Sequence, residues 1–115
     1  MYIYDKANEL ASMMKSSDDF LEYKRLKDIV YSDEKDKGLI KQYKNLQLKA
    51  QSSYMTGETP DPEVMDRLKK IGEVLQFNED ISKFLIAEYN FNTLVGDVYK
   101  IIGQACEIDL DMFKE

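Results

Sequence analysis

The stretch that decides the fold is residues 77–105, FNEDISKFLIAEYNFNTLVGDVYKIIGQA. Apolar side chains recur along it in alternating steps of four and three residues, the spacing that lines one face of an α-helix. The stripe is formed by Phe77, Ile81, Phe84, Glu88, Phe91, Val95, Val98, Ile102 and Ala105. Glu88 is its only polar member. Leu85, Leu94 and Ile101 widen the stripe beyond a coiled-coil seam, which favours a helix in a multi-helix bundle.

Four segments before this stretch also show helical spacing. We predict helices at about Ile3–Lys15, Asp18–Tyr31, Asp33–Met55, Pro62–Gln76 and Glu79–Cys106. Side chains that cap free helix amides mark the starts, namely Ser17, Asp61 and Asn78, and Ser32 before Asp33 repeats the pattern. Gly57, Pro60 and Pro62 predict the one strong loop. Because no stretch alternates like a β-strand, the chain is predicted to be a single all-α domain over residues 1–115.

The last predicted helix is too long for a compact chain of 115 residues. A compact domain of this length has a radius of gyration of about 13 Å and a diameter of about 34 Å, whereas about 28 helical residues span about 42 Å. Since the stripe is apolar to both ends, the overhang requires a partner. We predict an antiparallel bundle completed by homo-oligomerisation, most simply a two-fold homodimer. The predicted oligomer interface comprises Phe84, Glu88, Phe91, Val95, Val98 and Ile102.

The composition excludes several kinds of site. The chain has no histidine, one cysteine and a net charge of −6. Without histidine it has no Ser-His-Asp relay and no His-based metal site, and a single thiol forms no internal disulfide. Cys106 is predicted to pack as a small apolar residue. No run approaches an export signal or the roughly 20 apolar residues that cross a bilayer. We therefore expect a cytoplasmic protein that is not an enzyme, with no cofactor, metal or membrane contact.

Clusters of charge leave two other functions open. Acidic residues gather at Asp18–Asp19, Asp33–Asp36, Glu79–Asp80 and Glu107–Asp111. They could serve a carboxylate-based small-ligand or metal-dependent enzyme, but most lie where helices start and where acids stabilise the free amides. Lys37, Lys41 and Lys44 share a helix face that could contact RNA phosphates. A sequence pI of about 4.7 makes nucleic-acid binding the less favoured interpretation.

Three further features concern contacts with other helices or proteins. Glu88 is predicted to face a packed stripe, and we interpret it as a polar residue that sets the register between helices, paired with a lysine. Gly96 and Gly103 share a face of the long helix. They either admit another backbone or are simply tolerated. Tyr54 and Met55 lie beside the loop and are predicted to contact a partner protein.

Short motifs spread along the chain carry a family resemblance. They are Tyr4-Asp5-Lys6-Ala7, Ser17-Asp18-Asp19-Phe20, Leu46-Gln47-Leu48, Met55-Thr56-Gly57-Glu58, Phe84-Leu85-Ile86-Ala87-Glu88 and Ile101-Ile102-Gly103. Together they resemble the YlbF/YmcA family of small all-helical bacterial proteins, most closely its YheA-like branch. The resemblance implies a non-enzymatic, cytoplasmic regulatory protein that self-associates. Relatives act in protein complexes that tune RNA processing and affect competence, sporulation and biofilm formation.

One branch of that family is linked to an iron–sulfur cluster and has a cysteine-rich tail. Here Cys106 is followed by Glu107, Ile108 and Asp109, and no further cysteine occurs. The resemblance therefore does not carry cluster binding over to this chain.

Overall fold

The structure is a computed structural model that describes residues 2–108. Its helices are α1 (Tyr2–Lys15), α2 (Asp18–Tyr31), α3 (Glu34–Met55), α4 (Pro62–Gln76) and α5 (Glu79–Ala105). The described part contains no strand, so the predicted all-α fold with five helices is confirmed. The predicted bounds differ from the observed ones by one residue at three helix ends: α1 starts at Tyr2, α3 starts at Glu34, and α5 ends at Ala105.

Helix starts follow the predicted caps with one exception. The side chains of Ser17, Asp61 and Asn78 each accept a hydrogen bond from a backbone N–H in the first turn of the following helix. The cap predicted at Ser32 is wrong, because Ser32 ends α2 and its hydroxyl donates backwards to a carbonyl of that helix. Asp33 caps α3 instead, since its carboxylate accepts from two successive backbone amides.

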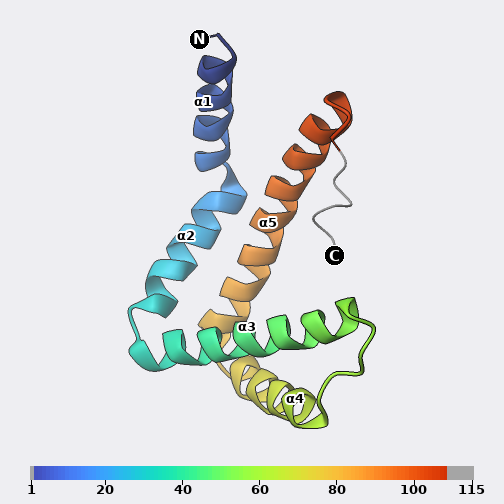
Figure 1. Cartoon of the computed structure of the whole chain (residues 1–115). Coiled ribbons are helices and arrows are strands. Elements are labelled where there is room, and N and C mark those ends of the chain that lie inside the picture. Colours follow the sequence, from blue (N-terminus) through green and yellow to red (C-terminus); the bar gives the residue numbers. More distant parts are fainter. Residues whose placement is uncertain (1, 109–115) are drawn as a thin grey trace.

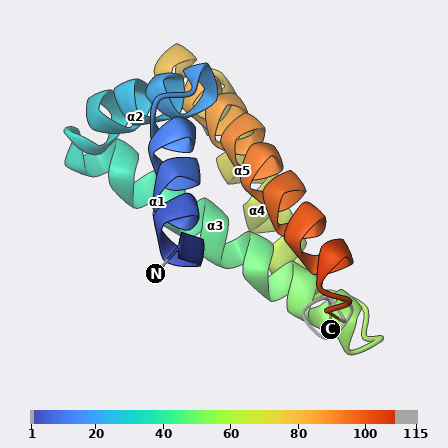
Figure 2. The ribbon, with the colours of Figure 1, turned by 90° about the horizontal axis from the view of Figure 1, so that it is seen from above.

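The helices form two antiparallel pairs that meet at a corner (Figures 1 and 2). α5 runs beside α2 in the opposite direction, and α3 and α4 form a hairpin across the first turns of α5. The radius of gyration is 17.4 Å and the extents are 50 × 37 × 17 Å. The radius of gyration of about 13 Å that was assumed for a compact chain of this length is therefore wrong. α1, beyond the far end of α2, and the second half of α5 both lie away from the corner with much of their surface exposed.

The core lies at this corner. Its fully buried side chains are Phe84, Leu26, Ile40, Ile81 and Val30, contributed by α2, α3 and the first half of α5. Tyr23 of α2 stacks on both Phe84 and Phe91, with ring centroids 5.9 and 5.4 Å apart. Such aromatic contacts add to the energy of burial. The first half of the apolar stripe on α5 is thus packed within the chain.

Two residues that were predicted to pack are exposed. Phe77, expected to begin the stripe, is 91% exposed because it caps the C-terminus of α4 and precedes α5. Cys106 is also exposed, so its predicted packing is wrong. It follows the last helical residue of α5, where no other described helix covers the chain.

Candidate functional site

The second half of α5 carries apolar side chains that its own chain leaves accessible. We call Leu94, Val95, Val98, Ile101 and Ile102 the distal stripe. Ile101 is 68% exposed and Ile102 is 47% exposed, while the other three are partly buried. Phe84, on the first half of the same helix, is fully buried. The predicted oligomer interface is therefore divided along α5 into a part covered by the chain itself and a part that remains open.

Each residue of that predicted interface can be placed on one side of the division. Phe84 and Phe91 contact the aromatic rings of α2, and Glu88 is paired inside the chain. The remaining predicted positions, Val95, Val98 and Ile102, belong to the distal stripe. These three are the ones available to a partner.

α1 is covered even less. None of its residues is buried, and only Met14 reaches partial burial. Its apolar face, which we call the α1 stripe, consists of Ile3, Ala7, Leu10 and Met14. Ile3 is 71% exposed and Leu10 is 36% exposed. The sequence predicted a helix at Ile3–Lys15 but held no signal that the chain would leave its apolar face uncovered.

Glu88 does have the lysine partner that its position predicted. Lys44 of α3 lies with its Nζ 2.5 Å from Glu88 Oε2 and 5.7 Å from the centre of the Phe84 ring. The Glu88 side chain is 18% exposed and that of Lys44 is 37% exposed. Because the pair is partly dehydrated and joins two helices, it orients α3 on α5. A role of Glu88 between copies of the chain stays a prediction.

We expect Glu88→Leu to raise the free energy of unfolding by up to about 1 kcal/mol, because the change extends an apolar stripe and Lys44 can turn its ammonium group to water. Assembly should at the same time become less uniform, since a polar register marker is lost. Urea unfolding and sedimentation measure the two effects. Lys44→Met is the matched control: it leaves the carboxylate of Glu88 without its partner and should lower stability. A large loss of stability in Glu88→Leu with unchanged assembly would contradict the interpretation.

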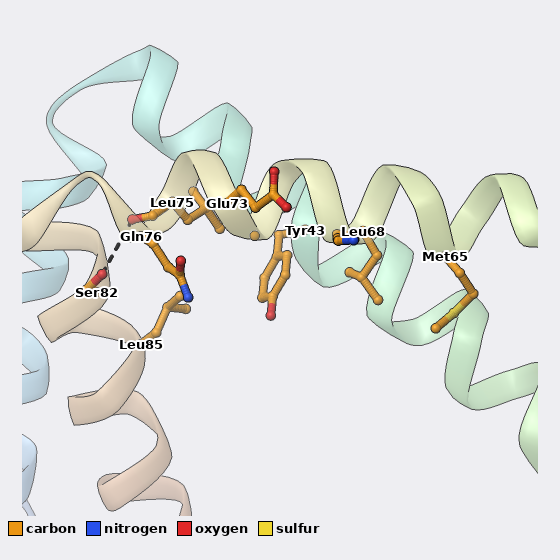
Figure 3. A pocket seen from close by; sticks show the side chains of 10 residues that line it. Tyr43, Met65, Leu68, Glu73, Leu75, Gln76, Ser82 and Leu85 are labelled. Atoms are coloured by element: carbon orange, nitrogen blue, oxygen red, sulfur yellow. Dashed lines mark hydrogen bonds between the residues drawn. The ribbon is translucent and has the colours of Figure 1, made fainter.

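A groove lies where α4 meets the first half of α5 (Figure 3). Its volume is about 460 Å³, and its apolar walls include Tyr43, Leu68 and Leu85. Figure 3 shows these side chains directed into the angle between the two helices. At the closed end, the hydroxyl of Ser82 donates to the carbonyl of Leu75 at 3.4 Å. The groove is thus a third accessible apolar surface, on the hairpin side of the corner.

The predicted partner contact lies at the far end of the α3–α4 hairpin. Tyr54 is 65% exposed and Met55 is 57% exposed, beside Gly57, whose φ of 79° turns the chain out of α3. Positive φ is readily adopted by glycine, which explains the helix end at this point. The two side chains are accessible, as the predicted contact requires.

The charged clusters serve mainly to stabilise helices. Among residues 2–108, no group of three or more His, Cys, Asp or Glu side chains is placed to hold a metal ion. Asp18 lies in the first turn of α2, and Glu79 lies in the first turn of α5. On the surface of α5, a hydrogen bond from Lys83 lowers the pKa of Glu79. Lys44 of the predicted basic face is engaged by Glu88. Asp109 and Asp111 of the last acidic cluster lie outside the described residues.

The two glycines of α5 differ in their surroundings. A Cβ added to Gly96 would meet no neighbouring atom within 4 Å in the described chain. Gly103 is buried, and its carbonyl accepts the N–H of Ile108 at 2.9 Å as the chain turns back. Gly96 is therefore not required by any close approach within the described part of the chain.

Among residues 2–108, no helix combines the length and the apolar character needed to cross a membrane.

These features define a small all-helical protein whose accessible apolar helix faces are candidate sites for contacts with other proteins. The chain belongs to the YlbF/YmcA family. The family described as "Control of competence regulator ComK, YlbF/YmcA" matches residues 3–107, and the expected family is confirmed.

Relatives and solved structures agree with this assignment. A "UPF0342 protein" of Halothermothrix orenii is 34% identical over 110 residues, which cover 96% of this chain and 93% of that protein. A Bacillus stearothermophilus "Protein of Unknown Function (DUF964)" has a TM-score of 0.71 and 20% identity, covering 93% and 94% of the two chains. Bacillus subtilis RicA, solved in complex with RicF, has a TM-score of 0.59 and 19% identity, covering 92% and 94%. The two structures show the fold.

Proposed function

We propose that this protein is a non-enzymatic regulatory adaptor that acts through contacts with other proteins. The observation that carries the proposal is the extent of accessible apolar helix surface, on α1, on the distal stripe and at Tyr54 and Met55. Exposed apolar side chains that gather on one helix face mark sites of protein association. The family's description as a control of a competence regulator supports a regulatory role, as does the fold shared with RicA, which was solved in a protein complex.

Self-association is part of this proposal. The distal stripe continues the face that forms the core and is only partly covered by its own chain, so it has the composition of a helix interface and keeps surface accessible to another copy. A homodimer through this stripe leaves the hairpin end, with Tyr54 and Met55, free for a different protein. By family resemblance the process served is RNA processing, competence, sporulation or biofilm control, in the cytoplasm.

Affinity purification with paired variants tests the adaptor role. A tagged chain should recover one protein in a fixed ratio, and the double change Tyr54→Ala and Met55→Ala should abolish its recovery, because central aromatic and sulfur-containing contacts dominate binding energy. Gln51→Ala, an exposed polar change on the same helix, is the matched control and should retain the partner. Equal recovery by all three chains would contradict the assignment of the hairpin end.

A thermal-shift screen separates the adaptor from a carboxylate-based enzyme. A tightly bound substrate or cation stabilises the folded state by mass action, by about 2.7 kcal/mol at a concentration of 100 times its Kd. We expect no rise in melting temperature with divalent cations or nucleotides. A rise abolished by Asp33→Asn or Glu79→Gln would favour the enzyme instead.

A further inference from the structure

A second groove lies where the first turn of α3 meets the turn between α4 and α5. Its volume is about 550 Å³, and its apolar wall is formed by Leu39, Val74 and Phe77. Phe77 is 91% exposed and Val74 is 54% exposed. Single exposed apolar residues are ordinary on protein surfaces, but these side chains lie together. We call this site the Phe77 groove, and the contacts proposed above do not use it.

Hydrogen bonds fix the backbone of the Phe77 groove. Asn78 caps α5 through its Oδ1, which accepts the N–H of Ile81 at 3.1 Å, and its Nδ2 donates to Asp36 Oδ2 of α3 at 3.3 Å. The backbone N–H of Phe77 donates to the carbonyl of Val74 at 3.2 Å. The exposed ring of Phe77 is therefore held between two helices on an ordered turn. Aromatic anchors on an ordered backbone bind a partner with a smaller loss of conformational entropy.

The segments that form the Phe77 groove carry the negative charge of the described chain. Residues 33–37 and 73–80 hold six carboxylates and two lysines. In the rest of residues 2–108, 13 Lys and Arg side chains balance 13 Asp and Glu side chains. The charged residues that line the groove itself are Asp33, Lys35, Asp36 and Glu79. The groove thus has an apolar wall inside an acidic rim.

The end of α4 adds to this negative potential. α4 has no basic residue in its last turn, so its own chain does not match the negative end of the helix dipole beside Phe77. The acidic rim repels nucleic-acid phosphates, acidic lipid headgroups and the same groove of a second copy. A neutral apolar segment would cover carboxylates without pairing them, which costs free energy. Arginine suits the groove best, because its guanidinium group pairs with carboxylates and stacks on aromatic rings.

We propose that the Phe77 groove docks a basic segment of another protein, with an arginine between the Phe77 ring and the acidic rim and a large apolar side chain beside Val74. The proposal rests on the adaptor role proposed above and adds a docking site and the chemistry of its partner. The site is separated from the hairpin end by α4, whose 15 residues span about 22 Å. Because apolar contact and charge both contribute, binding should weaken with salt.

Selection of short random peptides, displayed on phage, against the full chain tests this chemistry. Enriched peptides should be rich in arginine and should carry a large apolar residue. Fluorescence anisotropy of a labelled selected peptide then gives its Kd. Phe77→Ala should raise this Kd at least about 10-fold, since it removes the anchor of the site. Glu79→Gln should raise it about 3-fold, and an increase from about 0.05 to about 0.5 M NaCl should raise it about 10-fold.

Two matched controls separate the Phe77 groove from other exposed surface. Tyr54→Ala removes an exposed aromatic side chain from the hairpin end, and Glu63→Gln neutralises an exposed carboxylate in the first turn of α4. Both should leave the Kd of the peptide unchanged. Since every substitution in the series changes an exposed side chain, all variants should keep the circular dichroism of the wild-type chain.

The outcomes distinguish this site from the adaptor role itself. A selection that enriches no basic peptide overturns the docking site, and so does a basic peptide that binds Phe77→Ala as tightly as the wild-type chain. A partner recovered through Tyr54 and Met55 in either case leaves the adaptor role standing. A basic peptide that Phe77→Ala releases supports the site even where the hairpin end recovers no protein. Retention of RNA by the wild-type chain but not by Phe77→Ala would overturn the proposal in favour of nucleic acid.

Discussion

Phe84→Ala is expected to lower the free energy of unfolding by about 3–5 kcal/mol, the cost of removing a large aromatic ring from a packed core. Phe84 is completely inaccessible, and its ring contacts Tyr23 and Tyr31 of α2 at centroid distances of 5.9 and 5.7 Å. Lys44 lies over the same ring. The change therefore opens a cavity where α2, α3 and α5 meet, and the neighbouring helices cannot collapse into it without losing their own contacts. Urea unfolding followed by circular dichroism measures the loss.

The chain offers a matched control for this substitution. Phe77 is 91% exposed, so Phe77→Ala deletes the same side-chain atoms from a position that is already in contact with water. The free energy of unfolding should change by no more than about 0.5 kcal/mol. Similar losses for the two variants would mean that Phe84 is not the centre of the core. Since total stabilities of small domains are about 5–15 kcal/mol, the Phe84 variant should sit close to unfolding at 37 °C.

Val98→Glu is expected to convert an oligomeric chain into monomers while leaving the core folded. Val98 lies in the middle of the distal stripe, remote from the buried cluster around Phe84. In a two-fold dimer the substitution places a carboxylate in the interface from both copies. Burial of each unpaired charge costs several kcal/mol, and about 3 kcal/mol already weakens association more than 100-fold. Sedimentation should show the 13.4 kDa chain at concentrations where the wild-type chain is larger.

Gln104→Glu is the control for Val98→Glu. It adds the same charge to the same half of α5 at an exposed position outside the stripe, and should leave the assembly intact. Assembly that survives Val98→Glu would place the interface between copies elsewhere. A loss of unfolding cooperativity in Val98→Glu, in contrast, would show that the distal half of α5 belongs to the core of a single chain.

Local features of the fold were predictable because they depend on neighbours in sequence. The spacing of apolar side chains identifies each helix, and the caps at Ser17, Asp61 and Asn78 mark starts that the structure confirms. The exception at Ser32 has the same local origin. The side chains of Ser32 and Asp33 could each accept a hydrogen bond from a free backbone amide at the start of α3. Asp33 does so, because its carboxylate accepts from two such amides.

The candidate surfaces were only partly predictable. Tyr54 and Met55 could be identified from their place beside Gly57, and they are exposed. The stripe on α5 was also visible in the sequence, but a stripe of constant composition does not reveal which part its own chain covers. Phe84 is packed beneath α2 and α3, whereas Ile101 is 68% exposed on the same helix.

The sequence by itself determined five amphipathic helices and their boundaries to within one residue, since periodicity and capping act over a few residues. Short motifs spread along the chain carried the resemblance to the family that matches it. Only the tertiary structure decided how those helices share their apolar faces. α2 and the α3–α4 hairpin both pack on the first half of α5, whereas α1 ends before Ser16 and Ser17 and points away from these helices. The physical reason is that one helix face looks alike whether a distant segment of the chain or another molecule covers it. That choice depends on long-range contacts, and here it leaves α1 and part of the distal stripe of α5 exposed.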